Sequence, residues 1–387
     1  MQNDDTESRL RRLRGRVQPK RHNARTIAAL TSNPGCARRG VCDAAGVDKD
    51  ALAKRVGFPA RFGQSSFAIT RGNAFEAQVK ANGCAELLTL LREVLNLEIT
   101  EVGYTDLDEV GGNDSQGLRH AHSRSTLLAA AAGRDDVGTL FDHPLLRMEV
   151  AGNGVYLEPD LIAFQYAGIF HIIEIKSFAV IDGQADGGKV ASAAIQSAVY
   201  VHALRALLGN DDAVSSDIVL VCPKDFSNKP CATKVDVRKQ LIVLKHQLNR
   251  LAGIDSLLDP LPAGLTLDLA KDDAGQPART PAELVEALGC IPARYSPECL
   301  ASCELAFFCR EEATGETAAL GKSVREELGG VETVAAALGL AAGSLLPSEE
   351  QAEITALLRA AARIYGESAP AVTAAGGYAP LVAQAAA

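Results

Sequence analysis

The chain has 387 residues, of which 47% are hydrophobic and 22% are charged. This length leaves room for two domains or one large domain with appendages, and the composition excludes a wholly disordered chain and a small disulfide-stapled scaffold. The net charge of -9 is uneven, because residues 1–72 carry 15 Lys and Arg against 6 Asp and Glu. An acidic whole argues against indiscriminate binding of polyanions, whereas the basic amino-terminal part allows phosphate contacts.

No run of residues reaches the roughly 18 apolar positions that a membrane helix needs, and the amino terminus lacks the apolar stretch of a secretory signal. We therefore expect a cytoplasmic protein that is not bound to a membrane. Nine cysteines in a reducing compartment are expected to be core thiols or metal ligands rather than disulfides.

The segments are expected to form one α/β domain with additions at both ends. Residues 1–25 read as a basic disordered arm, 26–313 as the domain, 314–366 as a helical extension and 367–387 as a disordered tail. Within the domain, helical periodicity covers 73–98, and 100–142 is polar and rich in loops apart from a helical piece near 127–132. Alternating apolar residues then predict strands at 145–150, 155–166, 169–178 and 217–222, with helices at 189–208 and 235–251. The order predicts a mixed β-sheet flanked by helices.

The strongest chemical signal is a pair of carboxylates on neighbouring predicted strands. Asp160 follows Glu158 and Pro159, and Glu174 comes fourteen residues after Asp160, just before Ile175 and Lys176. A hairpin of this length can place Asp160 beside Glu174, and strand alternation puts Glu174 and Lys176 on the same side. The alternative is a surface hairpin, but the apolar neighbours of Glu174 favour a pocket.

Two carboxylates in one pocket call for a cation, and Mg²⁺ or Mn²⁺ prefers such oxygen ligands. A bound metal would lower the pKa of a water molecule and offset charge on a scissile phosphate, while Lys176 orients or deprotonates that water. This combination of residues predicts hydrolysis of a phosphodiester bond.

Three further residues have two interpretations each. Gln196 and Tyr200 are four apart on a predicted helix and could support Lys176, or they could be ordinary helix surface. Glu76 could be a third metal ligand, or it could close a capping box with Asn73.

The motifs Glu158-Pro159-Asp160, Glu174-Ile175-Lys176 and the Gln196 to Tyr200 pair together resemble the PD-(D/E)xK nucleases of the RecB type. The resemblance implies that Asp160, Glu174 and the Ile175 carbonyl hold the metal, that Lys176 is catalytic, and that Gln196 and Tyr200 support it. Many members carry a His after an Arg-Gly pair in the first helix. This chain has Arg71-Gly72 without that His, and Glu76 is its nearest substitute.

Cys299, Cys303 and Cys309 lie within eleven residues, a density typical of a Zn²⁺ site or an iron-sulfur cluster. A fourth ligand would come from elsewhere, with Cys36 favoured over Cys42 and Cys290. The alternative is a set of buried thiols without metal.

This cysteine pattern resembles RecB-type nucleases with an iron-sulfur cluster, such as CRISPR-associated nucleases of spacer acquisition and the AddB subunit. They place one Cys before the nuclease core and three after it, often as C-x2-C-x5-C, whereas this chain has C-x3-C-x5-C. The resemblance covers roughly residues 30–310 and implies a [4Fe-4S] cluster on Cys36 and the three later cysteines.

The sequence therefore predicts a metal-dependent DNA nuclease with a structural iron-sulfur cluster. Because the chain has no ATP-binding P-loop motif, we expect single strands, ends or flaps as substrates, with unwinding left to a helicase or nuclease-complex partner. The resemblance implies a role in DNA repair, phage defence or CRISPR adaptation. The alternative is a non-catalytic DNA-binding or assembly subunit that keeps the fold and the cluster.

Overall fold

The computed structural model describes residues 5–20, 22–33, 35–60, 66–97, 102–108, 115–133, 138–150, 153–158, 163–166, 168–225, 227–271 and 275–373. The chain forms two compact units. Unit 1 comprises Met1–Leu52 and Arg61–Pro292, and unit 2 comprises Ala53–Ala60 and Ala293–Ala387. The division after Pro292 lies upstream of the expected one between 313 and 314, and unit 2 also takes in a short segment from the amino-terminal part.

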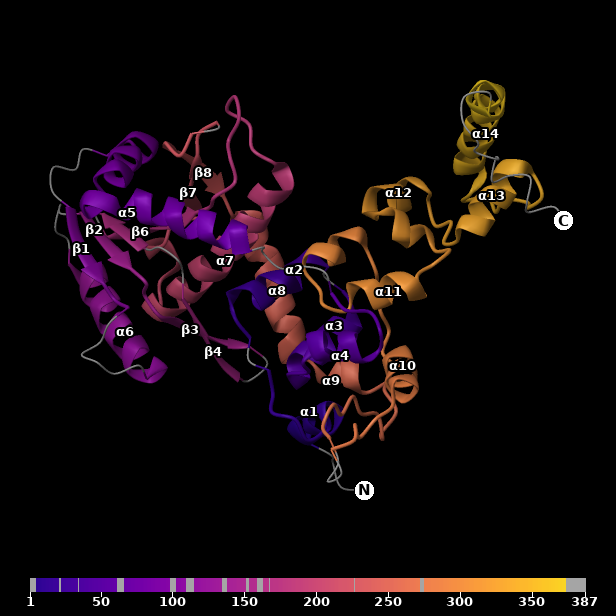
Figure 1. The fold of residues 1–387 in the computed structure, drawn as a ribbon, viewed down its shortest axis with the longest axis horizontal. Helices are drawn as coiled ribbons and strands as arrows, with labels where there is room; N and C mark the ends of the chain where they lie inside the picture. The colour runs from indigo at the N-terminus through magenta and orange to yellow at the C-terminus, as the bar shows by residue number, and fades with distance from the viewer. Residues whose placement is uncertain are drawn as a thin grey trace. The chain divides into compact units, whose positions relative to one another are not determined.

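The centre of unit 1 is a six-stranded mixed sheet with the strand order β1-β2-β5-β6-β7-β8 (Figure 1). Its strands are β1 (Val102–Asp106), β2 (Gly138–Asp142), β5 (Ala163–Tyr166), β6 (Ile169–Ile175), β7 (Asp217–Pro223) and β8 (Pro230–Asp236). The pairs β1–β2 and β6–β7 are parallel, and the other three are antiparallel. Strands β1, β2, β6 and β7 therefore all end at the same edge of the sheet. The predicted α/β class with a mixed sheet and flanking helices is confirmed.

A separate hairpin differs from the expectation of three consecutive strands. Strands β3 (Leu146–Val150) and β4 (Asn153–Leu157) form their own two-stranded sheet. The predicted strand over 155–166 is thus divided between β4 and β5.

Helices make up most of the rest of unit 1. Those of unit 1 are α1 (Thr6–Arg14), α2 (Ala24–Ser32), α3 (Ala37–Ala45), α5 (Ser66–Leu95), α6 (Gln116–Ala132), α7 (Gly187–Leu208), α8 (Arg238–Ala252), α9 (Asp255–Leu258) and α10 (Pro281–Gly289), together with the 3₁₀ turn η1 (Asp211–Ala213). Helix α4 (Lys49–Arg55) lies across the first division between the units. Helix α7 contacts β3, β6 and β7, and α5 contacts β7 and β8.

Helix α5 contains a break that follows from its backbone angles. Residues 81–84 have non-helical angles, and Asn82, Gly83 and Cys84 are left-handed. The segment is therefore two consecutive helices, in agreement with the expectation of one or two helices over 73–98.

The amino-terminal arm is ordered where it is described, unlike the expected disordered segment. Helix α1 buries Leu10 and Leu13. Arg9 pairs with Asp259 at 2.8 Å, and Arg16 pairs with Asp268 at 3.0 Å. Part of the positive charge of this arm is thus neutralised by ion pairs within unit 1. The number of charges in the sequence does not predict this pairing.

Unit 2 is helical in its described part. It contains η2 (Pro297–Ala301), α11 (Ala306–Glu312), η3 (Thr317–Leu320), α12 (Lys322–Glu327), α13 (Val334–Ala342) and α14 (Ala352–Thr373). Helices α13 and α14 pack against each other (Figure 1). Helix α14 continues past the expected start of a tail at 367, and residues 374–387 of that tail lie outside the described residues. Among the described helices, none has both the length and the apolar character to cross a membrane.

Candidate active site

The centre of the site is the carboxyl end of strand β6. Glu174 is 1% exposed, and its Oε1 lies 2.5 Å from the Nζ of Lys176, the residue just past the strand. The backbone of Lys176 continues the pairing with β7, since its amide donates to the Val221 carbonyl at 2.9 Å. A buried carboxylate is thus neutralised by an ammonium whose own position is fixed by the sheet.

Helix α7 carries Gln196 and Tyr200, which lie four residues apart and contact each other. Lys176 Nζ donates to Gln196 Oε1 at 3.3 Å, and Gln196 Nε2 donates to the Tyr200 hydroxyl at 3.0 Å. Gln196 and Tyr200 are therefore not ordinary helix surface, and Tyr200 is 1% exposed. The structure brings Glu174, Lys176, Gln196 and Tyr200 into one continuous polar chain.

The chain of hydrogen bonds extends to the segment that leads to Asp160. Tyr200 donates to the carbonyl of Glu158 at 3.4 Å, and the Glu158 carboxylate pairs with Arg119 at 2.9 Å. Asp160 itself lies outside the described residues. Strand β5 begins at Ala163, which pairs with Ile172 two residues before Glu174.

Two more side chains next to Glu174 carry no motif of their own. Ser197 is fully buried, and its hydroxyl donates to Glu174 Oε2 at 3.5 Å. Cys222 follows Val221 on β7, and burial raises the pKa of its thiol to about 12. Cys222 is therefore a neutral thiol beside the Glu174 and Lys176 pair at physiological pH.

Helix α5 places Glu76 along the same edge of the sheet. Gly72, Glu76 and Lys80 are four apart and share one helix face. A Cβ built at Gly72 would lie 3.8 Å from Ser177 Oγ beside the end of β6, while Lys80 Nζ donates to Asp142 at the end of β2 at 2.9 Å. Glu76 lies between these two contacts. Strand β5 lies between β2 and β6 and runs in the opposite direction. Glu76 is therefore on the part of the sheet edge where β5 begins.

The capping interpretation of Glu76 is wrong. Helix α5 begins at Ser66, so that Asn73 lies inside the helix and is not its cap. Glu76 is 28% exposed by its side chain and pairs with Lys80 at 2.6 Å. The carboxylate is therefore part of a side-chain network at the sheet edge.

A second polar cluster surrounds Asp142. Its carboxylate is 3% exposed and accepts a hydrogen bond from the Tyr104 hydroxyl at 2.6 Å in addition to that from Lys80. His143 Nδ1 lies 3.1 Å from the same carboxylate, and the backbone of His143 is left-handed, with a φ of 50°. Burial alone would lower the pKa of Lys80, but its hydrogen bonds to Glu76 and Asp142 hold that pKa above its ordinary value. Lys80 therefore carries a positive charge.

The three clustered cysteines lie together in unit 2. All are buried, with Cys299 in η2, Cys309 in α11 and Cys303 between them. The Cys303 amide donates to the Cys299 carbonyl at 2.8 Å. Within the described residues, no three His, Cys, Asp or Glu side chains form a group spaced for a metal ion.

Cys36 lies in unit 1, at the start of α3. Three bonds from Arg38 tie this helix to the end of the unit: its amide donates to the Pro292 carbonyl at 2.9 Å, and its side chain donates to the carbonyls of Ile291 and Leu288. Of the alternatives, Cys42 is fully buried and Cys290 is exposed.

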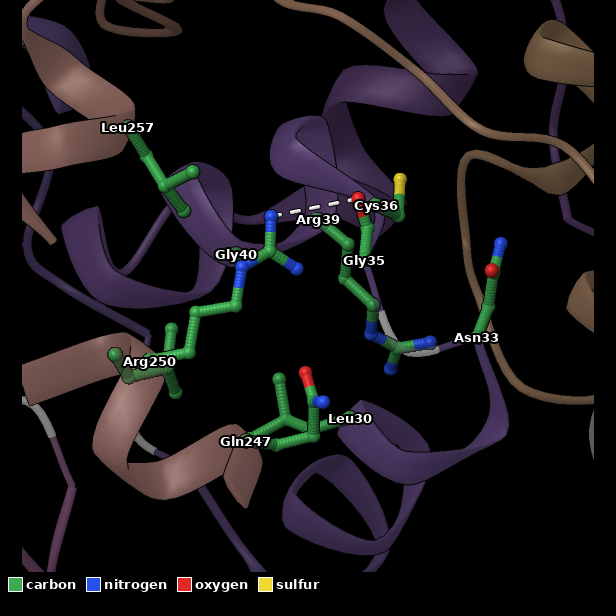
Figure 2. A pocket seen from close by; sticks show the side chains of 10 residues that line it. Leu30, Asn33, Gly35, Cys36, Arg39, Gly40, Gln247, Arg250 and Leu257 are labelled. Carbon is green, nitrogen blue, oxygen red and sulfur yellow. Dashed lines mark hydrogen bonds between the residues drawn. The ribbon is translucent and has the colours of Figure 1, made fainter. Parts of the chain in front are cut away.

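A small pocket of about 10 Å³ adjoins Cys36, and two of its lining residues are Arg39 and Arg250. Arg250 donates to the Gly35 carbonyl at 3.4 Å, and the Cys36 sulfur points away from both guanidinium groups (Figure 2). This volume holds about one water molecule, so the pocket is not a substrate site.

The donor atoms at the sheet edge suit a hard cation. Glu174 and Glu76 offer carboxylate oxygens, and a buried carboxylate such as Glu174 is favourable only beside positive charge. Carboxylate oxygens of this kind suit Mg²⁺ or Mn²⁺ rather than a soft metal.

No protein-family model and no curated protein matches this chain. A crystal structure from Eubacterium rectale, described as a "putative exonuclease", is similar with a TM-score of 0.28 and 12% identity, over 66% of this chain and 85% of that chain. A likeness of this size carries no conclusion about fold or activity.

Proposed function

We propose that this protein is a divalent-metal-dependent deoxyribonuclease that hydrolyses phosphodiester bonds. The observation that carries the proposal is the buried Glu174 carboxylate paired with the partly exposed Lys176, which Gln196 and Tyr200 hold at the carboxyl edge of the sheet. Burying a carboxylate in this way costs several kcal/mol in desolvation, a cost typical of functional sites.

The residues divide the chemistry among them. Glu174, Glu76, Asp160 and the Ile175 carbonyl would hold Mg²⁺ or Mn²⁺, which when bound makes water more acidic and offsets the charge of the phosphate. Lys176 is a hydrogen-bond donor that orients the attacking water or a phosphate oxygen. Gln196 fixes the Lys176 side chain, and Tyr200 fixes the chain at Glu158, two residues before Asp160.

The finer assignment rests on the sequence motifs. They favour a nuclease of the RecB type that acts on single strands, ends or flaps, together with a helicase or nuclease-complex partner. DNA repair, phage defence or CRISPR adaptation would be its setting, in the cytoplasm.

We propose in addition that Cys36, Cys299, Cys303 and Cys309 hold a [4Fe-4S] cluster, with Zn²⁺ as the alternative metal. One observation supports this: Cys299, Cys303 and Cys309 are all buried within one short segment. Such a cluster would close a loop of more than 250 residues and stabilise the fold around the catalytic edge.

The test compares degradation of end-labelled single- and double-stranded DNA by wild type and Lys176→Ala, with Mg²⁺ or Mn²⁺. We expect the variant to lose activity by roughly 10²- to 10⁴-fold, the range for removal of a positioned proton donor or acceptor. Lys245→Ala is the matched control. Lys245 is a half-exposed lysine on α8 that pairs with Asp211 of η1.

Equal cutting by wild type and Lys176→Ala would place the activity elsewhere or in a contaminant. Binding of DNA without cutting by any variant, with and without candidate partners, would favour the non-catalytic subunit instead.

A further inference from the structure

The end of β2 carries a rigid anchor that the nuclease motifs do not include. Asp142 is almost fully buried, and it contacts Tyr104 on β1 and Lys80 on α5 at 2.6 Å and 2.9 Å. A carboxylate with two such partners in a dry environment has little rotational freedom. Asp142 therefore fixes the position of the Lys80 ammonium.

Lys80 joins this anchor to Glu76. Its Nζ lies 2.6 Å from Glu76 Oε1 and 2.9 Å from Asp142 Oδ1. The exposed fraction of the three side chains rises in order, from 3% for Asp142 to 15% for Lys80 and 28% for Glu76. Asp142, at the inner end of this series of contacts, is thus fixed by packing. Glu76, at the outer end, is open to a ligand.

We infer that Lys80, anchored on Asp142, is a positioning residue that holds the Glu76 carboxylate at the sheet edge between β2 and β6 for metal binding. This inference rests on the proposed function. A free glutamate samples several rotamers, and ordering such a ligand costs side-chain entropy on metal binding; the Lys80 contact orders the Glu76 carboxylate before the metal binds. Groups that orient metal ligands typically change metal affinity or activity by about 10- to 100-fold when they are replaced.

The experiment measures the Mn²⁺ concentration that gives half-maximal DNA cleavage, and separately the binding of Mn²⁺ from the spectrum of the free ion in electron paramagnetic resonance. Lys80→Met is expected to raise both values at least tenfold, with the rate at saturating Mn²⁺ changed much less. Lys80→Arg, which keeps the charge and both contacts, is expected to restore the wild-type values. Lys245→Met is the control for loss of a lysine from an ion pair on another surface.

A double variant separates positioning from a general effect on the fold. If Lys80 acts through Glu76, then Lys80→Met causes no further loss of Mn²⁺ affinity in a Glu76→Ala background. A structural role would lower the affinity equally in both backgrounds. Tyr104→Phe is a milder variant, because it removes only the hydroxyl that donates to Asp142. Tyr104 is 48% exposed, so this change leaves the packing of β1 intact.

The outcomes are distinct. A wild type that cleaves and binds Mn²⁺ together with an unchanged or tighter-binding Lys80→Met variant would overturn this inference alone. Equal losses in the two backgrounds would also overturn it. A wild type that neither binds Mn²⁺ nor cleaves DNA would overturn the proposed function and this inference with it.

Discussion

Asp43 is a buried carboxylate near the amino terminus. It is 4% exposed and pairs with Lys49 and Arg39, which are buried to a similar degree. Burial by itself would raise the pKa of Asp43, but Lys49 and then Arg39 outweigh that effect and hold the pKa below its ordinary value. The carboxylate is therefore charged, and two buried cations depend on it.

Replacing Asp43 by Asn keeps the size of the side chain and removes its charge. We expect a loss of about 3–5 kcal/mol in the free energy of unfolding, because the buried Lys49 and Arg39 side chains would lose the negative charge with which they pair. Chemical denaturation followed by circular dichroism measures this. Asp211→Asn, which breaks an exposed pair with Lys245, should cost less than about 1 kcal/mol. Similar losses for both variants would contradict the burial argument.

The residues of the candidate site were predictable to different degrees. Glu174 and Lys176 were expected on one side because they are two apart on a strand, and Gln196 and Tyr200 because they are four apart on a helix. Lys80 lies four residues after Glu76, so their contact on one helix face could have been predicted from the sequence. Asp142 and Ser197 had no such signal, since Asp142 is the last residue of an unrecognised short strand and Ser197 contacts Glu174 only through the packing of α7 on β6.

At the scale of elements, prediction succeeded where the apolar pattern was dense. Strands β6 and β7 and helix α7 lie in the core and match the expected segments closely. The edge strands β1 and β8 were missed, because each has a mostly half-exposed pattern that resembles a loop. The predicted strand at 155–166 was wrong in one respect: it joins two strands, β4 and β5, that belong to separate sheets.

The segment from η2 to α11 offers a prediction of its own. If the three cysteines on this segment bind a cluster, anaerobically purified protein should be brown, absorb near ~400 nm and contain about four irons per chain. Cys303→Ser should lose most of this iron, because Cys303 lies between the two other cysteines, whereas Cys84→Ser should keep it. Stoichiometric zinc would replace the iron assignment, and a colourless protein without either metal would overturn the cluster.

At the scale of the whole molecule, three histidines make the free energy of unfolding depend on pH. Burial lowers the pKa of His22, His171 and His202 below the ordinary value of 6.5. The unfolded chain therefore binds more protons than the folded one as the pH falls below about 6.5, and folding loses free energy in that range.

We expect the denaturant midpoint of unit 1 to be constant near neutral pH and to fall progressively as the pH drops below about 6.5. Measuring the midpoint between pH 5.0 and 7.5 checks this. His202→Gln should make the dependence on pH shallower, whereas His122→Gln, on an exposed position of α6, should leave it unchanged. A midpoint that rises on acidification would contradict the sign.

Unit 2 is built from two segments that are more than 200 residues apart in the chain, Ala53–Ala60 and Ala293–Ala387. Phe58 of the first packs edge-on against Phe308 of the second, with ring centroids 5.6 Å apart. A stop codon after Pro292 would thus remove most of unit 2 but leave its first segment, Ala53–Ala60, in the truncated protein. Phe58 would then lack its contact with Phe308. Neither truncation nor a single crossover between genes can exchange this unit cleanly, so the two segments are expected to be inherited together.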